Sequence, residues 1–315
     1  MEEIYDCIII GGGPAGLNAA VVLGRCRRKV LVFDSKQYRN RWSHGMHNYL
    51  TRDDIPPSEF LKICHREIEK YDVKKIEKKI VHARKNSKSL FVAKDEDGQT
   101  YLSKKMLIAT GLQDNHLNVP GFQEMYGKSI HHCPYCDGWE WKDKKLGVYA
   151  KEKNGTELAL ALKGWSNDVT YFTDGGNKVK PLEEEELRAN KIDIVRLPIK
   201  EFKGNSGLIE SIVFKDGKEH TIDALFFVNG FKQQCDIVET FGCDINRKGV
   251  VVTNRFQQTT MPGLYVAGDA DKDMQLVVVA AAEGAKAAVI INKELQKEIS
   301  SARMGRKVPE VVVAP

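Results

Sequence analysis

The sequence has 315 residues, enough for two domains that each bury a core, and its 48 basic and 43 acidic residues leave a net charge of +5. The basic runs are interrupted by Glu, Ile and Asp, and the seven cysteines are scattered and odd in number, so we expect neither a nucleic-acid partner nor a secreted disulfide framework. The longest clean apolar run, Leu276 to Ala282, is too short to cross a bilayer and no basic flank opens the chain, so we expect no membrane partner and a reducing, cytoplasmic location.

The first elements are a strand, a glycine-rich loop and a helix. Tyr5 to Ile10 is apolar and β-branched, and residues 17–23 carry small and apolar side chains at helical spacing. The loop between them fits the pattern G-x-G-x-x-G, with glycines at positions 11, 13 and 16. The missing side chains let a backbone turn sharply and approach a pyrophosphate at a helix N-terminus. We therefore predict a nucleotide-binding loop rather than a glycine-rich turn with no ligand.

The next segment strengthens this interpretation. A second strand, Lys29 to Phe33, ends in Asp34. A carboxylate at a strand end, about 20 residues after the glycines, suits the two hydroxyls of an adenosine ribose. The order of strand, loop, helix, strand and acid thus predicts a dinucleotide-binding unit.

One helix, a meander and a buried strand are expected next. Pro56 to Ser58 open a half-buried surface helix. Residues 73–94 alternate in short runs and Asp97-Gly98 turns the chain back towards Tyr101, which predicts a small β-meander. Lys105 to Ala109 predicts a buried strand of its own, and Thr110 and Gly111 follow it.

Cys133 and Cys136 form a C-x-x-C stretch that Asp137 follows at once. Two such sulfurs can close a disulfide, and one of the thiols is often acidic enough to be a thiolate near neutral pH. His131 and His132 directly precede the stretch, but a zinc site needs two further ligands, and no second cysteine pair or spaced histidine pair follows. We therefore favour redox chemistry and expect no metal. The alternative from another class is a non-enzymatic metal-binding or redox-sensor module.

A second strand–loop–helix unit follows, but its loop lacks the glycines. The strand Lys145 to Tyr149 and the helix Thr156 to Lys163 flank a loop with Ala150 and Glu152 where the first loop has Gly. A carboxylate about 4 Å from a phosphate costs on the order of 4 kcal/mol at an effective dielectric of about 20. The next strand ends at Asp174, with no arginine pair nearby for a 2′-phosphate. We expect a weak nicotinamide site that favours NADH over NADPH.

The second domain is completed by a helix and three strands. Glu183 to Glu186 predicts an exposed, acidic helix start. The strands are expected at residues 192–195, 209–214 and 225–228.

Gly230 marks the return to the first domain. A buried strand from Leu264 runs into a turn with Asp269 at its tip, and a small, apolar helix is expected from Leu276 to Ile291. The charged tail after Lys293 is expected to be surface-bound or frayed, and Val311 to Val313 to pack on a partner subunit.

Four motifs, in their order and spacing, resemble the low-molecular-weight thioredoxin reductases and their relatives over residues 4 to 292. They are the glycine loop at 11–16, Ala109-Thr110-Gly111, Cys133-Pro134-Tyr135-Cys136-Asp137-Gly138 and the stretch from Gly263 to Asp269. The resemblance implies an α/β fold with two Rossmann-like, three-layer ββα nucleotide-binding domains, the second inserted in the first, and a homodimer. The FAD-binding domain would comprise residues 1–114 and 233–315, and the inserted NAD(P)H-binding-like domain, with the redox centre, residues 115–232.

By this resemblance the cofactor is FAD, with Asp34 on its ribose, Asn48 near the flavin and Asp269 on the ribityl chain. The implied cofactor-binding residues are Gly11, Gly13, Pro14, Ala15, Gly16, Asp34, Asn48, Thr110, Gly111, Gly268, Asp269, Gln275 and Leu276. Gln275 and Leu276 stand where the family more often has a basic residue and Gln.

The resemblance also implies roles for the C-x-x-C stretch. Cys136 would face the flavin, Cys133 would exchange with a substrate dithiol or disulfide, and Asp137 would move the proton. Because thiolate is the nucleophile, each exchange step needs an acid or base within hydrogen-bond reach. The alternative for Asp137 is an Asp-Gly turn residue. His131 and His132 are expected to be strand or surface residues, and the alternative is that one of them acts as a base, since imidazole titrates near the working pH.

The expected function is FAD-dependent electron exchange between the Cys133/Cys136 disulfide and a thioredoxin-like protein or a small dithiol/disulfide substrate. Three routes stay open at the other end of the electron path. They are NAD(P)H at a weak or unconventional site, a ferredoxin-like protein donor, and dioxygen as acceptor while a substrate dithiol is oxidised.

Overall fold

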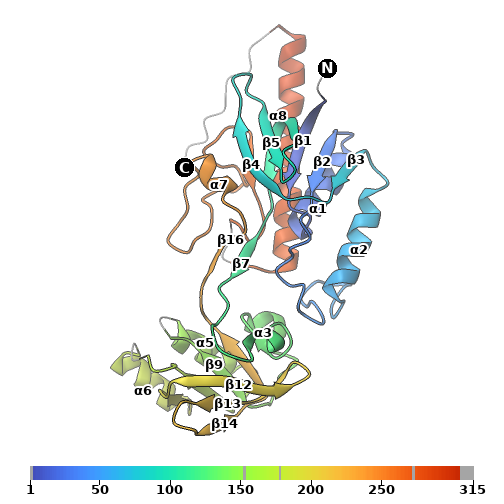
Figure 1. The fold of residues 1–315 in the computed structure, drawn as a ribbon. Coiled ribbons are helices and arrows are strands. Elements are labelled where there is room, and N and C mark those ends of the chain that lie inside the picture. The colour runs from blue at the N-terminus through green and yellow to red at the C-terminus, as the bar shows by residue number, and fades with distance from the viewer. Residues whose placement is uncertain (1–2, 152–153, 177–178, 272–273, 306–315) are drawn as a thin grey trace.

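The computed structural model describes residues 3–151, 154–176, 179–271 and 274–305. It has two α/β domains, and the second is inserted between two parts of the first, as predicted (Figure 1). A two-stranded antiparallel ribbon, β7 (Leu112–Asp114) with β16 (Phe231–Gln233), connects the domains. We keep residues 115–232 as the proposed extent of the inserted domain.

The first domain is built on a parallel sheet of five strands. Their order is β3 (Val73–Ile76), β2 (Val30–Phe33), β1 (Ile4–Ile10), β6 (Thr100–Ile108) and β17 (Leu264–Val266). Since β17 comes from the far end of the chain and pairs with β6, both parts of the sequence are needed to complete this sheet.

The predicted meander is wrong in two respects. Val73 to Ile76 joins the parallel sheet beside β2, so the antiparallel part contains only β4 (Ile80–Lys85), β5 (Phe91–Asp95) and the first half of β6. The two strands expected around Tyr101 and from Lys105 are one nine-residue strand. Its first half pairs with β5 and its second half with β17.

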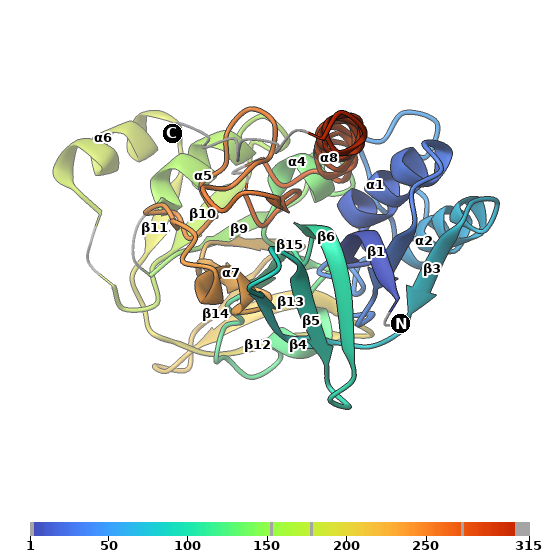
Figure 2. The same ribbon diagram turned by 90° about the horizontal axis from the view of Figure 1, so that it is seen from above.

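The two faces of this sheet have separate apolar cores because side chains alternate along each strand. In β1, Cys7 and Ile9 pack with the helices on one face, whereas Ile8 and Ile10 pack towards β4, β5 and the short helix α7 (Ile237–Thr240) on the other. The helices are α1 (Pro14–Arg25), α2 (Pro57–Ile68) and α8 (Val277–Arg303). Figure 2 shows α1 and α8 side by side.

Helix α8 is longer than predicted. It continues through the charged segment after Lys293 to Arg303, and Leu295 in that segment is 1% exposed. Glu294 and Glu298 both pair with the buried Lys105 of β6 at 2.7 Å, so the acidic side chains anchor the helix to the sheet. The predicted contact of Val311 to Val313 with a partner subunit lies outside the described residues.

The inserted domain has a five-stranded parallel sheet between two layers. Its strands, in spatial order, are β11 (Asp193–Val195), β10 (Val169–Phe172), β9 (Leu146–Tyr149), β15 (Ala224–Phe227) and β8 (Ile130–His131).

The two layers that cover this sheet give the predicted ββα arrangement. One face packs on an antiparallel sheet and a short helix, which are β12 (Ile199–Asn205), β13 (Leu208–Phe214), β14 (Glu219–Thr221) and α3 (Phe122–Met125). The other face packs on α5 (Gly155–Leu162) and α6 (Pro181–Ala189). The helix around Glu183 to Glu186 and the three predicted strands are therefore confirmed, whereas β12 and β14 were not anticipated. No helix within the described part of the chain is long and apolar enough to span a membrane.

Candidate active site

One cavity joins the first glycine loop to the C-x-x-C stretch. The loop, the end of β2 and the start of α8 line it from the first domain, and His132, Cys136 and Asp137 line it from the inserted domain. The predicted site residues that line it are Gly11, Gly13, Pro14, Ala15, Asp34, Thr110, Gly111, Cys136, Asp137, Gly268, Asp269, Gln275 and Leu276. The structure thus brings together most residues of four motifs that are far apart in the sequence.

The three glycines of the G-x-G-x-x-G pattern lack a side chain for two different reasons. Gly11 has a φ of +123°, and a Cβ there would lie 2.1 Å from the carbonyl oxygen of Ala109. A Cβ on Gly16, which does not line the cavity, would lie 1.9 Å from the carbonyl oxygen of Gly11. A Cβ on Gly13 would meet no atom within 4 Å. Gly11 and Gly16 are therefore needed for folding, whereas Gly13 leaves space at the N-terminus of α1.

Asp34 ends β2 inside the cavity and is held by its own neighbours. The backbone N–H of Lys36 donates to Oδ1 at 2.8 Å, the Tyr38 hydroxyl donates to Oδ2, and Nε2 of His65 lies 3.5 Å from Oδ2. Burial acts to raise the pKa of Asp34, but the contacts with His65 and Tyr38 outweigh it and the pKa lies below its usual value. Asp34 is therefore a carboxylate.

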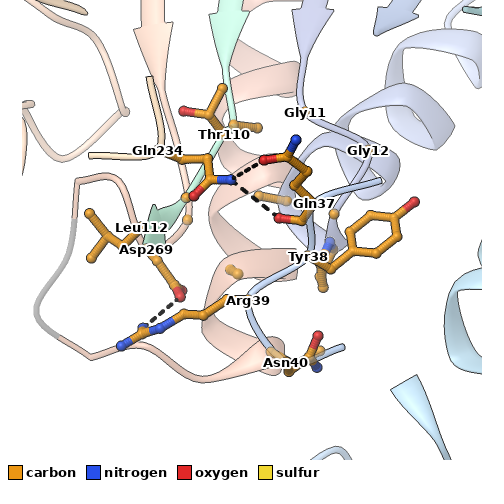
Figure 3. A pocket seen from close by; sticks show the side chains of 18 of the residues that line it. Gly11, Gly12, Gln37, Tyr38, Arg39, Asn40, Thr110, Leu112, Gln234 and Asp269 are labelled. Carbon is orange, nitrogen blue, oxygen red and sulfur yellow. Dashed lines mark hydrogen bonds and ion pairs between the residues drawn. The ribbon is translucent and has the colours of Figure 1, made fainter. Parts of the chain in front are cut away.

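The residue that the sequence analysis missed is Arg39, in the loop after β2. Its Nε and Nη2 donate to the two oxygens of Asp114 at 2.8 and 2.5 Å, which is a bidentate pair. Its Nη1 donates to Asp269 at 3.1 Å (Figure 3) and to Gln275. Tyr126 of the inserted domain also donates to Asp114, at 2.7 Å. A guanidinium thus stands in the cavity beside Gln275, in the region where the family more often has a basic residue.

The charges of this cluster follow from burial and from the guanidinium. Burial opposes ionisation of Asp114, but Arg39 holds the pKa of this carboxyl far below its usual range. Burial raises the pKa of Asp269 in spite of Arg39. No sequence pattern marks Arg39, because its partners are 75 and 230 positions away.

The two cysteines occupy unequal positions around the short helix α4 (Pro134–Asp137). Cys136 lines the cavity, whereas Cys133 does not and precedes the helix. The backbone N–H of Cys136 donates to Sγ of Cys133 at 3.2 Å. The Cys136 thiol and this N–H lower the pKa of Cys133, and the same contact with Cys133, together with burial, raises the pKa of Cys136. In the reduced pair Cys133 is therefore the more acidic of the two thiols.

Asp137 and the two histidines lie beside the cysteines. Nδ1 of His131 is 3.3 Å from Oδ1 of Asp137, and Nδ1 of His132 is 3.8 Å from Oδ2 of Asp114. Burial and the nearby Arg39 lower the pKa of His132 to about 4. Within the described ranges, no three His, Cys, Asp or Glu side chains are close enough together to hold a metal ion.

Asn48 does not line the cavity. Its Nδ2 donates to the carbonyl oxygen of Tyr135, between the two cysteines, at 2.7 Å. Its placement beside the flavin stays a prediction, and in this structure it connects the first domain to the C-x-x-C stretch.

Ala150 and Asp174, the described residues of the predicted second nucleotide site, are held by side chains and backbone of their own domain. Ala150 is fully buried, and the hydroxyl of Tyr171 donates to its carbonyl oxygen at 3.1 Å. Asp174 accepts hydrogen bonds from the N–H of Ile199 at 2.7 Å and from the hydroxyl of Tyr149 at 3.1 Å. The predicted obstruction by Glu152 lies outside the described residues.

The comparisons of this chain with protein families, with individual proteins and with solved structures all lead to one family. Residues 5–284 match the pyridine nucleotide-disulphide oxidoreductases. Thioredoxin reductase tcpT of Claviceps purpurea (strain 20.1) is 34% identical over 85% of this chain and 87% of its own. TrxB of Bacillus anthracis, a structure assigned as a thioredoxin reductase, is 34% identical over 94% of this chain and 99% of its own, with a TM-score of 0.89. The structure of HlmI is 28% identical over 97% of each chain, with a TM-score of 0.93.

The fold, the shared cavity and these similarities agree with one another. The chain therefore belongs to the pyridine nucleotide-disulphide oxidoreductase family and is a flavin-dependent thiol-disulfide oxidoreductase similar to the thioredoxin reductases.

Proposed function

We propose that the cavity of the first domain holds FAD non-covalently. The fit rests on the space at Gly13, on the N-terminus of α1 that opens into the cavity, and on the buried carboxylate of Asp34 at the far side of the loop. Thr110, Gly268 and Asp269 line the remaining wall. When bound, FAD would supply two-electron exchange with the cysteine pair.

The observation that carries the proposed reaction is that Cys136 and the glycine loop line the same cavity. We propose that Cys136 is the cysteine next to the flavin, and that Cys133, the lower-pKa thiol, exchanges with the substrate. Asp137 lies within the same cavity wall and would accept and return the thiol proton. The substrate is a thioredoxin-like protein or a small dithiol or disulfide.

The nicotinamide route is the weakest of the three electron routes. Ala150 is buried beneath Tyr171, and Asp174 already accepts two hydrogen bonds from its own domain. We propose that NADPH reduces this protein poorly, that NADH does so slightly better, and that a ferredoxin-like donor or a substrate dithiol is the more effective reductant. With a dithiol as reductant, dioxygen is the acceptor. We also propose a homodimer, which sedimentation measurements would test.

Cysteine variants test the proposed roles. Cys136→Ser should leave Cys133 able to form a long-lived mixed disulfide with a thioredoxin-like or small disulfide substrate. Cys133→Ser removes the sulfur that most raises the pKa of Cys136, so we expect a Cys136 thiolate beside the flavin and a long-wavelength charge-transfer band.

The opposite pattern would exchange the two assignments, and retained turnover in both variants would remove the pair from catalysis. The matched control is Cys26→Ser, because Cys26 is exposed and lies outside the cavity. The colour and zinc content of the purified protein distinguish the enzyme from a metal-binding module. A yellow protein with a flavin spectrum and no stoichiometric zinc supports the enzyme, whereas a colourless zinc protein supports the module.

A further inference from the structure

His131 has its two ring nitrogens fixed by two different partners. It lies at the end of β8 and is 4% exposed. Nε1 of Trp141 donates to its Nε2 at 3.0 Å, and an indole nitrogen can only donate. Nε2 must therefore carry the lone pair, which places the proton of the neutral ring on Nδ1. Nδ1 lies 3.3 Å from Oδ1 of Asp137.

The surroundings of the ring oppose a second proton on it. The rings of Phe226 and Trp141 lie 5.5 and 6.1 Å from that of His131, so the ring is enclosed by aromatic groups. A proton on Nε2 would face the indole N–H across the same 3.0 Å, which replaces an attraction by a repulsion. The contact with Trp141 therefore favours the tautomer whose proton is on Nδ1, the nitrogen that faces Asp137.

We propose that His131 is a positioning residue, which holds the carboxylate of Asp137 towards the cysteines while Trp141 fixes the tautomer of the imidazole. This inference rests on the proposed function, in which Asp137 transfers the thiol proton. The other ionisable groups that interact with Asp137 are His132, Cys133 and Cys136, and Arg39 and Asp114 in turn act on His132.

The exchange itself balances with these residues. In the direction that oxidises a dithiol, one substrate thiol gives its proton to Asp137, and the resulting thiolate attacks Sγ of Cys133. The Cys133–Cys136 bond breaks and Cys136 leaves as thiolate. Asp137 passes its proton to the Cys136 thiolate and then takes the proton of the second substrate thiol. The thiolate so formed attacks the substrate sulfur of the mixed disulfide, and Cys133 leaves as thiolate, so that the substrate is oxidised by two electrons and the cysteine pair is reduced by two. The second proton passes from Asp137 to solvent, and His131 keeps its own proton throughout.

The test combines a mutant cycle with a spectroscopic readout on the flavin-loaded protein. His131→Leu should lower turnover about tenfold or more, within the range that acid–base assistance contributes. His131→Asn should retain most turnover, because an amide N–H can occupy the place of Nδ1–H. In an Asp137→Asn background, His131→Leu should add no further loss, since it acts only through Asp137.

Nitrogen-15 NMR of the imidazole should show the Nδ1–H tautomer. Trp141→Phe removes the indole donor to Nε2, so the Nε2–H tautomer should then be populated as well. An Nε2–H tautomer in the unmodified protein, or losses from His131→Leu and Asp137→Asn that multiply, would overturn the inference. Failure of the proposed function is distinguishable, because Asp137→Asn alone would then leave turnover unchanged while the tautomer stays as described.

Discussion

The two strand–loop–helix units of this chain share a topology but differ in the side chains that surround the start of the helix. In the first unit, Gly13 faces open space and its loop lines a cavity that reaches Cys136. In the second, Tyr171 donates to the carbonyl of Ala150, and a Cβ on Gly155 would lie 2.2 Å from the Tyr171 hydroxyl oxygen. A phosphate site therefore depends on the side chains around the helix start as much as on the backbone path. Five changes would break or sharpen this contrast.

The largest effect is expected from Gly13→Glu. Its Cβ has space, so the protein should fold, but a carboxylate about 4 Å from the pyrophosphate costs about 4 kcal/mol, or about three decades in affinity. The variant should purify without colour, as absorbance near the flavin band will show. Gly13→Gln has the same size and no charge and should lose less flavin. A Gly13→Glu protein with its full flavin complement would move the pyrophosphate elsewhere.

Removing Arg39 should have the largest effect on stability. Arg39→Ala leaves Asp114 buried without its bidentate partner, which costs about 3–5 kcal/mol of unfolding free energy. The matched change in the second unit is Lys151→Ala, whose partner contact with Asp174 is solvent-exposed and should cost below about 1 kcal/mol. Denaturant titration measures both.

The pH dependence of Arg39→Ala has a defined sign. Without Arg39, the folded-state pKa of the buried Asp114 should be raised above its unfolded value. The loss of unfolding free energy should therefore be greatest at neutral pH and decrease as the pH falls towards about 4. A deficit that stays constant from pH 7 to 4.5 would mean that the guanidinium acts through packing rather than charge.

Nicotinamide reduction tests the second loop directly. Stopped-flow reduction of the flavin by NADPH or NADH should be slow and hard to saturate. Replacing Ala150 and Glu152 by Gly should raise the NADH-driven rate about tenfold or more. The replacement removes a charge repulsion that would lower the affinity for the nucleotide by up to about three decades. Rapid, saturable reduction of the unmodified protein by micromolar NADPH would make it an ordinary NADPH-dependent reductase.

The two strand-end carboxylates should respond differently to the same change. Asp34→Asn should weaken flavin binding by about tenfold, since hydrogen bonds to a charged group contribute about 1.5–3 kcal/mol. Asp174→Asn should leave flavin content unchanged and lower unfolding free energy by about 1 kcal/mol, through its bonds to Ile199 and Tyr149. Flavin content and thermal unfolding, measured on both variants, distinguish a carboxylate that contacts the cofactor from one that contacts only the protein.

A small effect is also expected from Tyr171→Phe. It removes one hydroxyl bond to the Ala150 carbonyl and should cost about 0.5–1.5 kcal/mol of stability. Combined with the glycine replacements, it should raise NADH-driven reduction further. No additional gain in the combined variant would show that Tyr171 packs beside the loop without obstructing it.

The sequence predicted the parts of the molecule that depend on local pattern. Strands, turns and the glycine loop follow from short runs of residues, and the C-x-x-C stretch carries its chemistry in five positions. The single strand β6 was predicted as two strands, with the buried Lys105 as the start of the second. Ser103 is buried and donates to the carbonyl of Lys105, whose ammonium pairs with α8.

The parts that could not be predicted depend on tertiary packing. The charged end of α8 reads as a frayed tail until Lys105 supplies its partner, and Arg39 looks like one more surface cation until Asp114 and Asp269 surround it. Similarly, Asp174 has the position of a ribose ligand, but strand pairing brings the N–H of Ile199 to its carboxylate. Long-range partners decided each of these cases.

The return of the chain through β16 has a consequence for synthesis on the ribosome. The first domain lacks β17 and α8 until the last part of the chain is made, and α8 packs so closely on α1 that a Cβ on Gly284 would lie 1.9 Å from the carbonyl oxygen of Ala15. The inserted domain has all its strands by Phe227. We expect it to fold first on the nascent chain, while the sheet of β1 to β6 has only α1 and α2 on its helical face until α8 is translated.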